Sequence, residues 1–281
     1  MVKRVATALV GLPILVLLLY IGGIWLGLAL LVMSLVGLWE FFCAVSPKSG
    51  RKWLSVQGVA YVFTVVYYVG LFYGGLNPLL LLAAFMLALQ FLYVLSHKTT
   101  RLVDALAVPA GFFYIPVMFS FVWLVREGPW GLFMVWPIFI AASGSDTAAF
   151  LVGRQFGRHK LADSPSPGKS WEGCVGGALG AAALGFAYGW FAPQLFPNLL
   201  ELWEGHAQWE SATAVAVITS VAAVFSQFGD LFASAIKRAV GIKDYAHWLP
   251  GHGGALDRFD SILVTGAVVY LAVAVLAYVR V

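Results

Sequence analysis

The sequence predicts an all-α integral membrane protein that crosses the bilayer many times. Of its 281 residues, 61% are hydrophobic and 11% are charged, and the mean hydropathy is +0.88. Soluble domains carry roughly 25% charged residues, so a chain this apolar requires lipid as its solvent. Two further observations agree with this class. Apolar runs of membrane-spanning length recur along the chain, and the basic residues gather between alternate runs.

Glycines, prolines and clustered charges divide the chain into nine candidate helices, if each span takes roughly 17–25 residues; eight is the alternative count. Gly22 and Gly23 alone separate the first two, which form either one bent pair or a tight hairpin. The first run follows Lys3 and Arg4 as a signal peptide would, but it lacks an A-x-A cleavage signal and is expected to be retained. The expected helices are 5–21, 23–45, 53–73, 78–96, 102–124, 131–153, 171–193, 212–237 and 258–279.

The charge distribution supports nine helices with a cytoplasmic N-terminus and an external C-terminus. On this topology the cytoplasmic segments hold all of the 17 basic residues except Arg126 and Arg280. The outer loop 194–211 contains glutamates but no lysine or arginine. Because cytoplasmic segments of membrane proteins are enriched in lysine and arginine, we expect this orientation, with the polar motifs facing the cytoplasm.

The two parts of the chain differ in polar content. In residues 1–125 the acidic residues are Glu40 and Asp104, each near a cytoplasmic helix end, where a structural cap or an interfacial role is expected. We therefore expect residues 1–125 to be a transmembrane scaffold and residues 126–281 to carry the chemistry. Cys43 and Cys174 show no pairing pattern, so neither a disulfide nor a zinc site is expected.

Asp146 lies inside the apolar run AASGSDTAAFLVGR, residues 141–154. A carboxylate at such a position is costly unless it is paired or hydrated, so a functional role is preferred, with an interhelical hydrogen-bond anchor as the alternative. In the basic loop that follows, Ser170 can cap the next helix, with Glu172 in its first turn. The amides of that helix end, beside Lys169, would suit a phosphate. A P-loop is excluded, because Asp163 stands where the first glycine is required. Small-xxx-small pairs predict close packing of the helix, at Gly173, Gly176, Gly177 and Gly180.

The eighth expected helix ends in SQFGDLFASAIKRAVGIKD, residues 226–244. Helical spacing places four polar side chains close to one face: Ser226, Asp230, Ser234 and Lys237. This stripe indicates a hydrated functional seam, and a structural Asp–Lys pair is the alternative.

The stretch LPGHGGALDRFDS, residues 249–261, leads into the last helix, which is expected to begin near Ala255 or Asp257. Asp257, Asp260 and Ser261 would share one face of that helix. The glycines would let the backbone approach a ligand closely. A helix cap explains Asp257 alone, but it does not explain the second aspartate or the neighbouring His252.

Together these segments suit a metal ion and phosphate groups. Carboxylates favour a hard, oxygen-bound cation such as Mg²⁺, whereas zinc would need more ligands than His252 supplies. Cations beside such a metal suit phosphates, which indicates displacement at phosphorus, and the membrane location indicates a lipid substrate. The aspartates are Asp146, Asp230, Asp257 and Asp260, and the cations are Lys169, Lys237, Arg238, Lys243 and Arg258.

The run SAIKRAVGIKDYAHWLPGHGGALDRFD, residues 234–260, resembles the signature of the phosphatidate cytidylyltransferases, also called CDP-diacylglycerol synthases. The run SPGKSWEG, residues 166–173, is similar to a second motif of that family, with Gly168 in place of a lysine and Ser170 in place of a threonine. The resemblance covers the second half of the chain. The positions that match the signature are Ser234, Lys237, Arg238, Lys243, Asp244, Pro250, His252, Gly253, Gly254, Asp257, Arg258 and Asp260.

The resemblance implies Mg²⁺-dependent transfer of CMP from CTP to phosphatidic acid, giving CDP-diacylglycerol and pyrophosphate, and it allows K⁺ as a second cation. It implies Asp230 and Asp257 as metal ligands, with Asp260 and Asp146 as further ligands or supports. Lys237 and His252 would join Asp230 and Asp257 as catalytic residues. The residues expected to bind substrate are Lys169, Arg238, Lys243, Arg258 and Ser234.

Three other functions fit the sequence less well. An ion-coupled transporter could use Asp146 and Asp230 as a relay. Such proteins often show corresponding motifs in both halves, whereas the polar motifs of this chain lie in one half. A CDP-alcohol phosphotransferase would need a D-G-x-x-A-R motif, which is absent. A structural membrane protein would leave the intramembrane charges unexplained. We expect a bacterial plasma-membrane enzyme whose partners are CTP, phosphatidic acid and the bilayer, without nucleic acid, and a homodimer as one assembly.

Overall fold

The computed structural model is all-α, as the composition predicts. It describes residues 2–46, 56–161, 164–195, 208–246 and 253–279. Most residues within these ranges lie in helices, and the extended pairing among them is one isolated bridge between Lys160 and Ser170.

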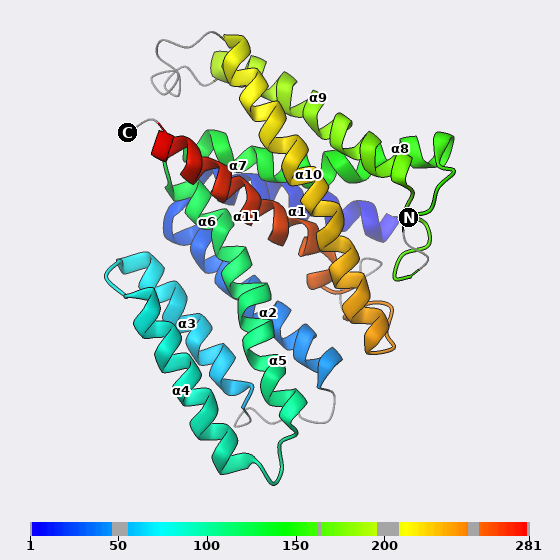
Figure 1. Cartoon of the computed structure of the whole chain (residues 1–281). Coiled ribbons are helices and arrows are strands. Elements are labelled where there is room, and N and C mark those ends of the chain that lie inside the picture. The colour runs from blue at the N-terminus through cyan, green and yellow to red at the C-terminus, as the bar shows by residue number, and fades with distance from the viewer. Residues whose placement is uncertain (1, 47–55, 162–163, 196–207, 247–252, 280–281) are drawn as a thin grey trace. The chain divides into compact units, whose positions relative to one another are not determined.

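The described residues form nine continuous helical segments, in the order and close to the limits that the sequence predicts (Figure 1). Seven are long and apolar enough to cross a membrane, and Gly11–Ile21 and Gly58–Tyr73 are shorter apolar helices. The segments are α1 (Val2–Ile21), α2 (Gly23–Val45), α3 (Gly58–Tyr73), α4 (Pro78–Ser96), α5 (Leu102–Phe112) with η1 (Phe113–Val117) and α6 (Met118–Glu127), α7 (Gly131–Phe139) with η2 (Ile140–Gly144) and α8 (Ser145–Phe156), α9 (Trp171–Leu195), α10 (Gln208–Ala239) and α11 (Leu256–Val279).

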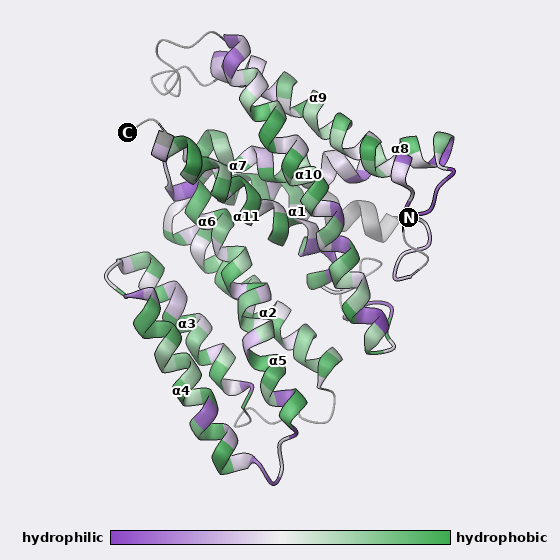
Figure 2. Ribbon diagram, in the orientation of Figure 1, coloured by the Kyte–Doolittle hydropathy of each residue, from purple (hydrophilic) through white to green (hydrophobic). Residues whose placement is uncertain are grey.

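The largest differences from the predicted limits are at helix starts. The third helix begins at Gly58 rather than at 53, and residues 53–55 lie outside the described ranges. Helix α10 begins at Gln208 rather than at 212. In the hydropathy of the ribbon, α9 alternates between apolar and near-neutral residues, and the described part of the α8–α9 loop is mostly hydrophilic (Figure 2).

The first two helices are separate, with the break at the predicted glycines. Gly22 and Gly23 have φ angles of 65° and 56°, a region that residues with a Cβ rarely adopt. The Trp123 indole N–H donates to the Gly23 carbonyl at 2.9 Å. This bond gives the first turn of α2 a fixed partner.

Helix α7 contains Pro137 just before the π-helical segment η2. Proline has no amide N–H, so it cannot donate to the carbonyl of Phe133 four residues earlier. The Tyr188 hydroxyl of α9 donates to that carbonyl at 2.9 Å, and the Tyr188 and Phe133 rings stack with centroids 5.1 Å apart. Tyr188 therefore compensates for the irregular turn that precedes Ser145 and Asp146.

Replacing Tyr188 with phenylalanine is expected to destabilise the protein by about 1–2 kcal/mol, because the Phe133 carbonyl loses its donor while the ring contact remains. Thermal unfolding of the purified protein in detergent measures the change. Tyr278→Phe is the matched control, since the Tyr278 side chain is 85% exposed. Equal unfolding temperatures for the two variants would show that the hydroxyl does not support α7.

The chain divides into two compact units. One comprises Met1–Trp123 and Val240–Arg258, and the other comprises Leu124–Ala239 and Phe259–Val281. Helix α11 thus begins in the first unit and continues in the second. The expected functional division, a scaffold in 1–125 and a catalytic region in 126–281, stays a prediction.

In the second unit, glycines allow α9 to pack closely on α8 and α10, as predicted from their spacing (Figure 1). A Cβ atom on Gly176 would lie 2.5 Å from the Val152 side chain. One on Gly177 would lie 2.9 Å from both the Ser145 hydroxyl and the Gln227 amide nitrogen. Since such distances are too short for real Cβ atoms, the packing of these three helices depends on glycine.

Candidate active site

The centre of the candidate site is an ion pair between Lys169 and Asp230 in the second unit. Lys169 lies in the α8–α9 loop, and its Nζ is 2.5 Å from Asp230 Oδ2. The same Nζ donates to the backbone carbonyl of Gln227 at 3.4 Å. Both charged side chains are half-buried. The loop lysine is therefore anchored to the face of α10 that carries the predicted polar stripe.

Two more aspartates interact with this pair. Asp146 on α8 interacts electrostatically with Asp230 and with Lys169. Asp260 on α11 interacts with Asp230, Lys237 and Asp146. Three carboxylates from three helices and two lysines thus form one electrostatic cluster within the second unit.

The four residues of the predicted stripe on α10 are all at least half-buried. Ser226 and Lys237 are buried, and Asp230 and Ser234 are half-buried. The Ser226 hydroxyl, one turn before Asp230, is buried and has no hydrogen-bond partner within the part of the chain that the structure describes. A buried hydroxyl without a partner is costly, so this position suits an additional polar group.

A pocket of about 290 Å³ opens beside the cluster. Asp146 and Lys169 contribute charges to its wall, together with Arg154 at the end of α8 and the amide of Gln227. The pocket has both signs of charge, so it can take a polar, anionic group. Its lining also includes Gly153, Gly168, Ser170, Gly173 and Cys174.

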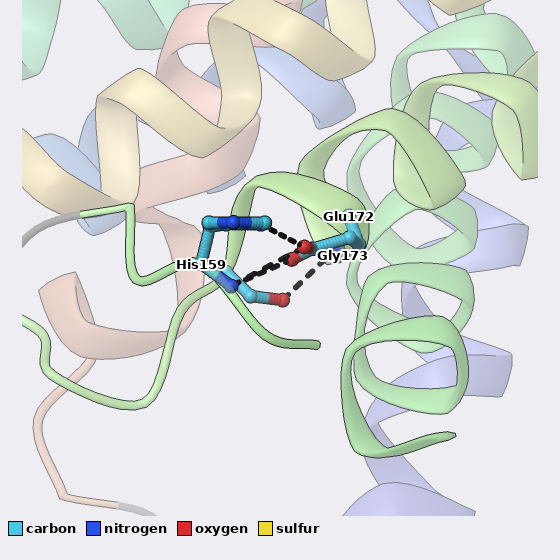
Figure 3. Close-up of polar contacts among 4 residues, drawn as sticks. His159, Glu172 and Gly173 are labelled. Atoms are coloured by element: carbon cyan, nitrogen blue, oxygen red, sulfur yellow. Dashed lines mark hydrogen bonds and ion pairs between the residues drawn. The ribbon is translucent and has the colours of Figure 1, made fainter. Parts of the chain in front are cut away.

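The loop that carries Lys169 is closed by a contact between His159 and Glu172 (Figure 3). The His159 Nδ1 lies 2.7 Å from Glu172 Oε1, and the His159 amide donates to the same carboxylate at 3.2 and 3.3 Å. The Leu161 amide donates to the Lys169 carbonyl at 2.8 Å. Glu172 therefore holds His159, in the first part of the loop, against the start of α9.

Ser170 caps α9, as predicted: its hydroxyl accepts a hydrogen bond from the Gly173 amide at 3.1 Å. Fewer amides are available at this helix end than the predicted phosphate site would use. The Trp171 amide donates to the His159 carbonyl at 3.0 Å, so two of the first amides already have partners. Lys169 and Arg154 remain the groups that suit an anion here.

Gln227 joins the helices that form the site. It is buried on α10, and its Nε2 donates to the Ser145 hydroxyl at 3.2 Å and to the Cys174 carbonyl at 3.1 Å. One side chain thus connects α8, α9 and α10 one turn from Asp230. Because buried polar networks are costly to break, Gln227 fixes the walls of the pocket.

Asp257 belongs to the first unit, at the start of α11. Its Oδ2 accepts hydrogen bonds from the Tyr245 amide at 2.8 Å and from the Gly254 amide at 3.1 Å. The carboxylate of Glu40, on α2, accepts from the Ala255 amide at 2.8 Å and from the Leu256 amide at 2.7 Å. The start of α11 is therefore held by two carboxylates.

The remaining predicted site residues are half-buried or exposed, or they lie outside the residues that the structure describes. Ser234 is half-buried, and three basic residues are exposed: Arg238, Lys243 and Arg258. His252 lies outside the described residues. Among the described residues, no group of three or more His, Cys, Asp or Glu side chains is arranged as a metal site, so the predicted metal ligands stay a prediction.

Sequence reasoning missed three residues that the structure places at these sites. Arg154 was counted only as a topological charge, although its spacing from Asp146, two helical turns, already put both on one face. Gln227 had a visible signal, a polar amide inside an apolar helix. Glu40 was expected to have a structural cap or an interfacial role. It caps a helix that begins more than two hundred residues later, a partner that no local pattern reveals.

Comparison with known proteins identifies the family of this chain. A family model described as the cytidylyltransferase family matches residues 2–276. The chain therefore belongs to the cytidylyltransferase family, and it does so over nearly its full length.

The individual relatives are named for a more specific activity than the family is. A phosphatidate cytidylyltransferase of Brucella suis is 31% identical over 98% of this chain and 93% of the relative. One of Staphylococcus haemolyticus is 28% identical over 92% of this chain and 94% of the relative. One of Haemophilus influenzae is 37% identical over a shorter match, which covers 47% of this chain and 42% of the relative.

Proposed function

We propose that this protein is a CTP:phosphatidate cytidylyltransferase, which makes CDP-diacylglycerol. The observation that carries the proposal is the full-length match to the cytidylyltransferase family together with relatives named for this activity. The charged pocket beside Lys169 and Asp230, in a chain of apolar helices, supports a reaction between a water-borne anion and a lipid. None of the relatives named above is a transporter.

In this reaction a phosphate oxygen of phosphatidic acid attacks the α-phosphorus of CTP. The bond between that phosphorus and the bridging oxygen to the β-phosphate breaks, and pyrophosphate leaves with its electron pair. The attacking phosphate monoester is already anionic at neutral pH, so no general base is needed. The enzyme's task is to align the two anions and to stabilise the charge of the transition state.

The donor chemistry of the cluster fits Mg²⁺. The carboxylates of Asp146, Asp230 and Asp260 interact electrostatically, and the buried Ser226 hydroxyl has no hydrogen-bond partner among the described residues. These groups offer oxygen ligands, which a hard cation prefers. We propose Asp230 and Asp257 as principal ligands, with Asp260 and Asp146 as ligands or supports and K⁺ as a second cation. When bound, Mg²⁺ neutralises charge on the triphosphate.

The cations of the chain would hold the phosphates. Lys169 and Arg154 line the pocket and suit the anionic part of a substrate. The buried Lys237 lies within electrostatic reach of Asp260, so it can keep a nearby phosphate close to the carboxylates. Further phosphate contacts are proposed for Arg238, Lys243, Arg258, Ser234 and His252.

The charge distribution supports an active site that faces the cytoplasm, where CTP is available. We propose a bacterial inner membrane as the location, and a homodimer as the assembly.

A direct assay tests the function. Purified protein in mixed micelles, supplied with labelled CTP, phosphatidic acid and Mg²⁺, is expected to form a labelled lipid and an equal amount of pyrophosphate. Diacylglycerol in place of phosphatidic acid, or a chelator in place of Mg²⁺, should give no labelled product. Well-folded protein that forms no CDP-lipid would overturn the proposal, and so would equal activity with diacylglycerol.

A further inference from the structure

Glu40 is fully buried, with 0% of its surface exposed, on α2. Its two carboxylate oxygens accept separate hydrogen bonds from consecutive amides, Oε1 from Ala255 at 2.8 Å and Oε2 from Leu256 at 2.7 Å. Burial of a carboxylate is unfavourable without such partners. A charged acceptor at the positive end of a helix is favourable, so this contact fixes the start of α11.

Gly254 makes the contact possible. A Cβ atom at this position would lie 2.7 Å from Glu40 Oε2 and 2.8 Å from Oε1, closer than real Cβ atoms approach. The Gly254 amide itself donates to Asp257. Three successive amides, from Gly254 to Leu256, are thus used by two carboxylates of the same unit.

The two-oxygen contact has a geometric consequence. A single acceptor on Glu40 would hold the first turn of α11 at one amide, whereas its two oxygens hold the turn at two consecutive amides. Asp257 is the residue after Leu256, so its carboxylate takes its direction from this turn.

We propose that Glu40 is a positioning residue that orients Asp257 for metal binding. This inference rests on the proposed function, because it assigns Asp257 to the metal ion of that reaction. It also gives residues 1–125 a part beyond that of a scaffold. Groups that orient metal ligands typically contribute about 10–100-fold in affinity or activity.

The test replaces Glu40 with glutamine, which keeps the shape but turns one of the two acceptors into a donor facing an amide N–H. Mn²⁺ binding to the purified protein, followed by electron paramagnetic resonance, is expected to weaken about 10–100-fold. The Mg²⁺ concentration for half-maximal activity should rise accordingly, while the KM for CTP at saturating Mg²⁺ changes little. Hydrogen exchange at the amides of residues 254–256 should become faster.

Asp104→Asn is the matched control. Asp104 is also a buried carboxylate of the first unit, 2% exposed, in the first turn of a helix, where it pairs with Arg101 at 2.9 Å. It is expected to lower the unfolding temperature without changing Mn²⁺ affinity. Gly254→Ala disturbs the same contact from the α11 side, and it should reproduce the effect of Glu40→Gln. If one of the two variants is poorly produced, the other still gives the test.

The outcomes separate the inference from the proposed function. Unchanged Mn²⁺ affinity in Glu40→Gln, with an unfolding temperature lowered as in Asp104→Asn, would reduce Glu40 to a structural role and overturn the inference alone. Wild-type protein that neither binds Mn²⁺ nor forms CDP-lipid would instead overturn the proposed function and the inference with it.

Discussion

Asp230→Asn is expected to lower cytidylyl transfer by about a thousand-fold, because the loss of one group that stabilises transition-state charge costs about 10²–10³ in rate and Asp230 also anchors Lys169. Asparagine keeps the size and shape of the side chain but removes the negative charge that pairs with Lys169 at 2.5 Å. The turnover number at saturating CTP and Mg²⁺, measured in mixed micelles, gives the effect.

Glu210→Gln is the matched control for this prediction. Glu210 lies in the first turn of the same helix, α10, and Asp230 lies in its second half. The control changes a carboxylate to a carboxamide with the same loss of charge, so it should retain near wild-type turnover. Retained activity in Asp230→Asn would remove Asp230 from the proposed metal ligands and leave it as a structural partner of Lys169.

Asp257→Asn is expected to lose more activity than the roughly 10–100-fold that follows the loss of a group which only orients a metal ligand, and about 1 kcal/mol of stability. The stability loss follows because Asp257 Oδ2 accepts from the Tyr245 and Gly254 amides. Hydrogen bonds to a charged acceptor are stronger than those to a neutral one. Turnover and thermal unfolding should be measured on the same preparation.

A comparison of two substitutions separates these roles. Asp257→Ala removes both accepted hydrogen bonds and should destabilise the protein more than Asp257→Asn, while both should be equally inactive. Asp257→Asn with full activity and lowered stability would mean that the carboxylate only holds the loop before α11. That result would also remove the basis for assigning Glu40 a part in metal binding.

The helices were predictable because their signal is local. Apolar runs and their breaks set the limits of α2 and α4 to the residue, and Gly22 marked the boundary between α1 and α2. The start of α11 at Leu256 falls between the two predicted positions, Ala255 and Asp257. In lipid, the backbone N–H and C=O groups of a spanning segment must be satisfied within the segment, which favours a helix. The apolar runs were therefore sufficient to predict the helices.

Contacts between distant segments were less predictable. The glycines before Asp257 predict room for a ligand, and the structure adds that Gly254 makes room for Glu40. Lys169 was expected beside open amides of α9, but two of these amides have partners in the chain and Lys169 pairs with Asp230. Glu40 and Asp230 lie on α2 and α10, and sequence spacing does not show which helices meet.

The sequence by itself determined that this protein is a polytopic helical membrane protein, and it carried the motif by which its family is recognised. Both follow from local properties, apolar runs that only lipid can solvate and polar residues at set spacings. Only the tertiary structure decided which charges are paired: Lys169 with Asp230, and Glu40 with the first amides of α11. The physical reason is that a buried charge takes the nearest complementary group in space, and packing of the helices determines which group that is.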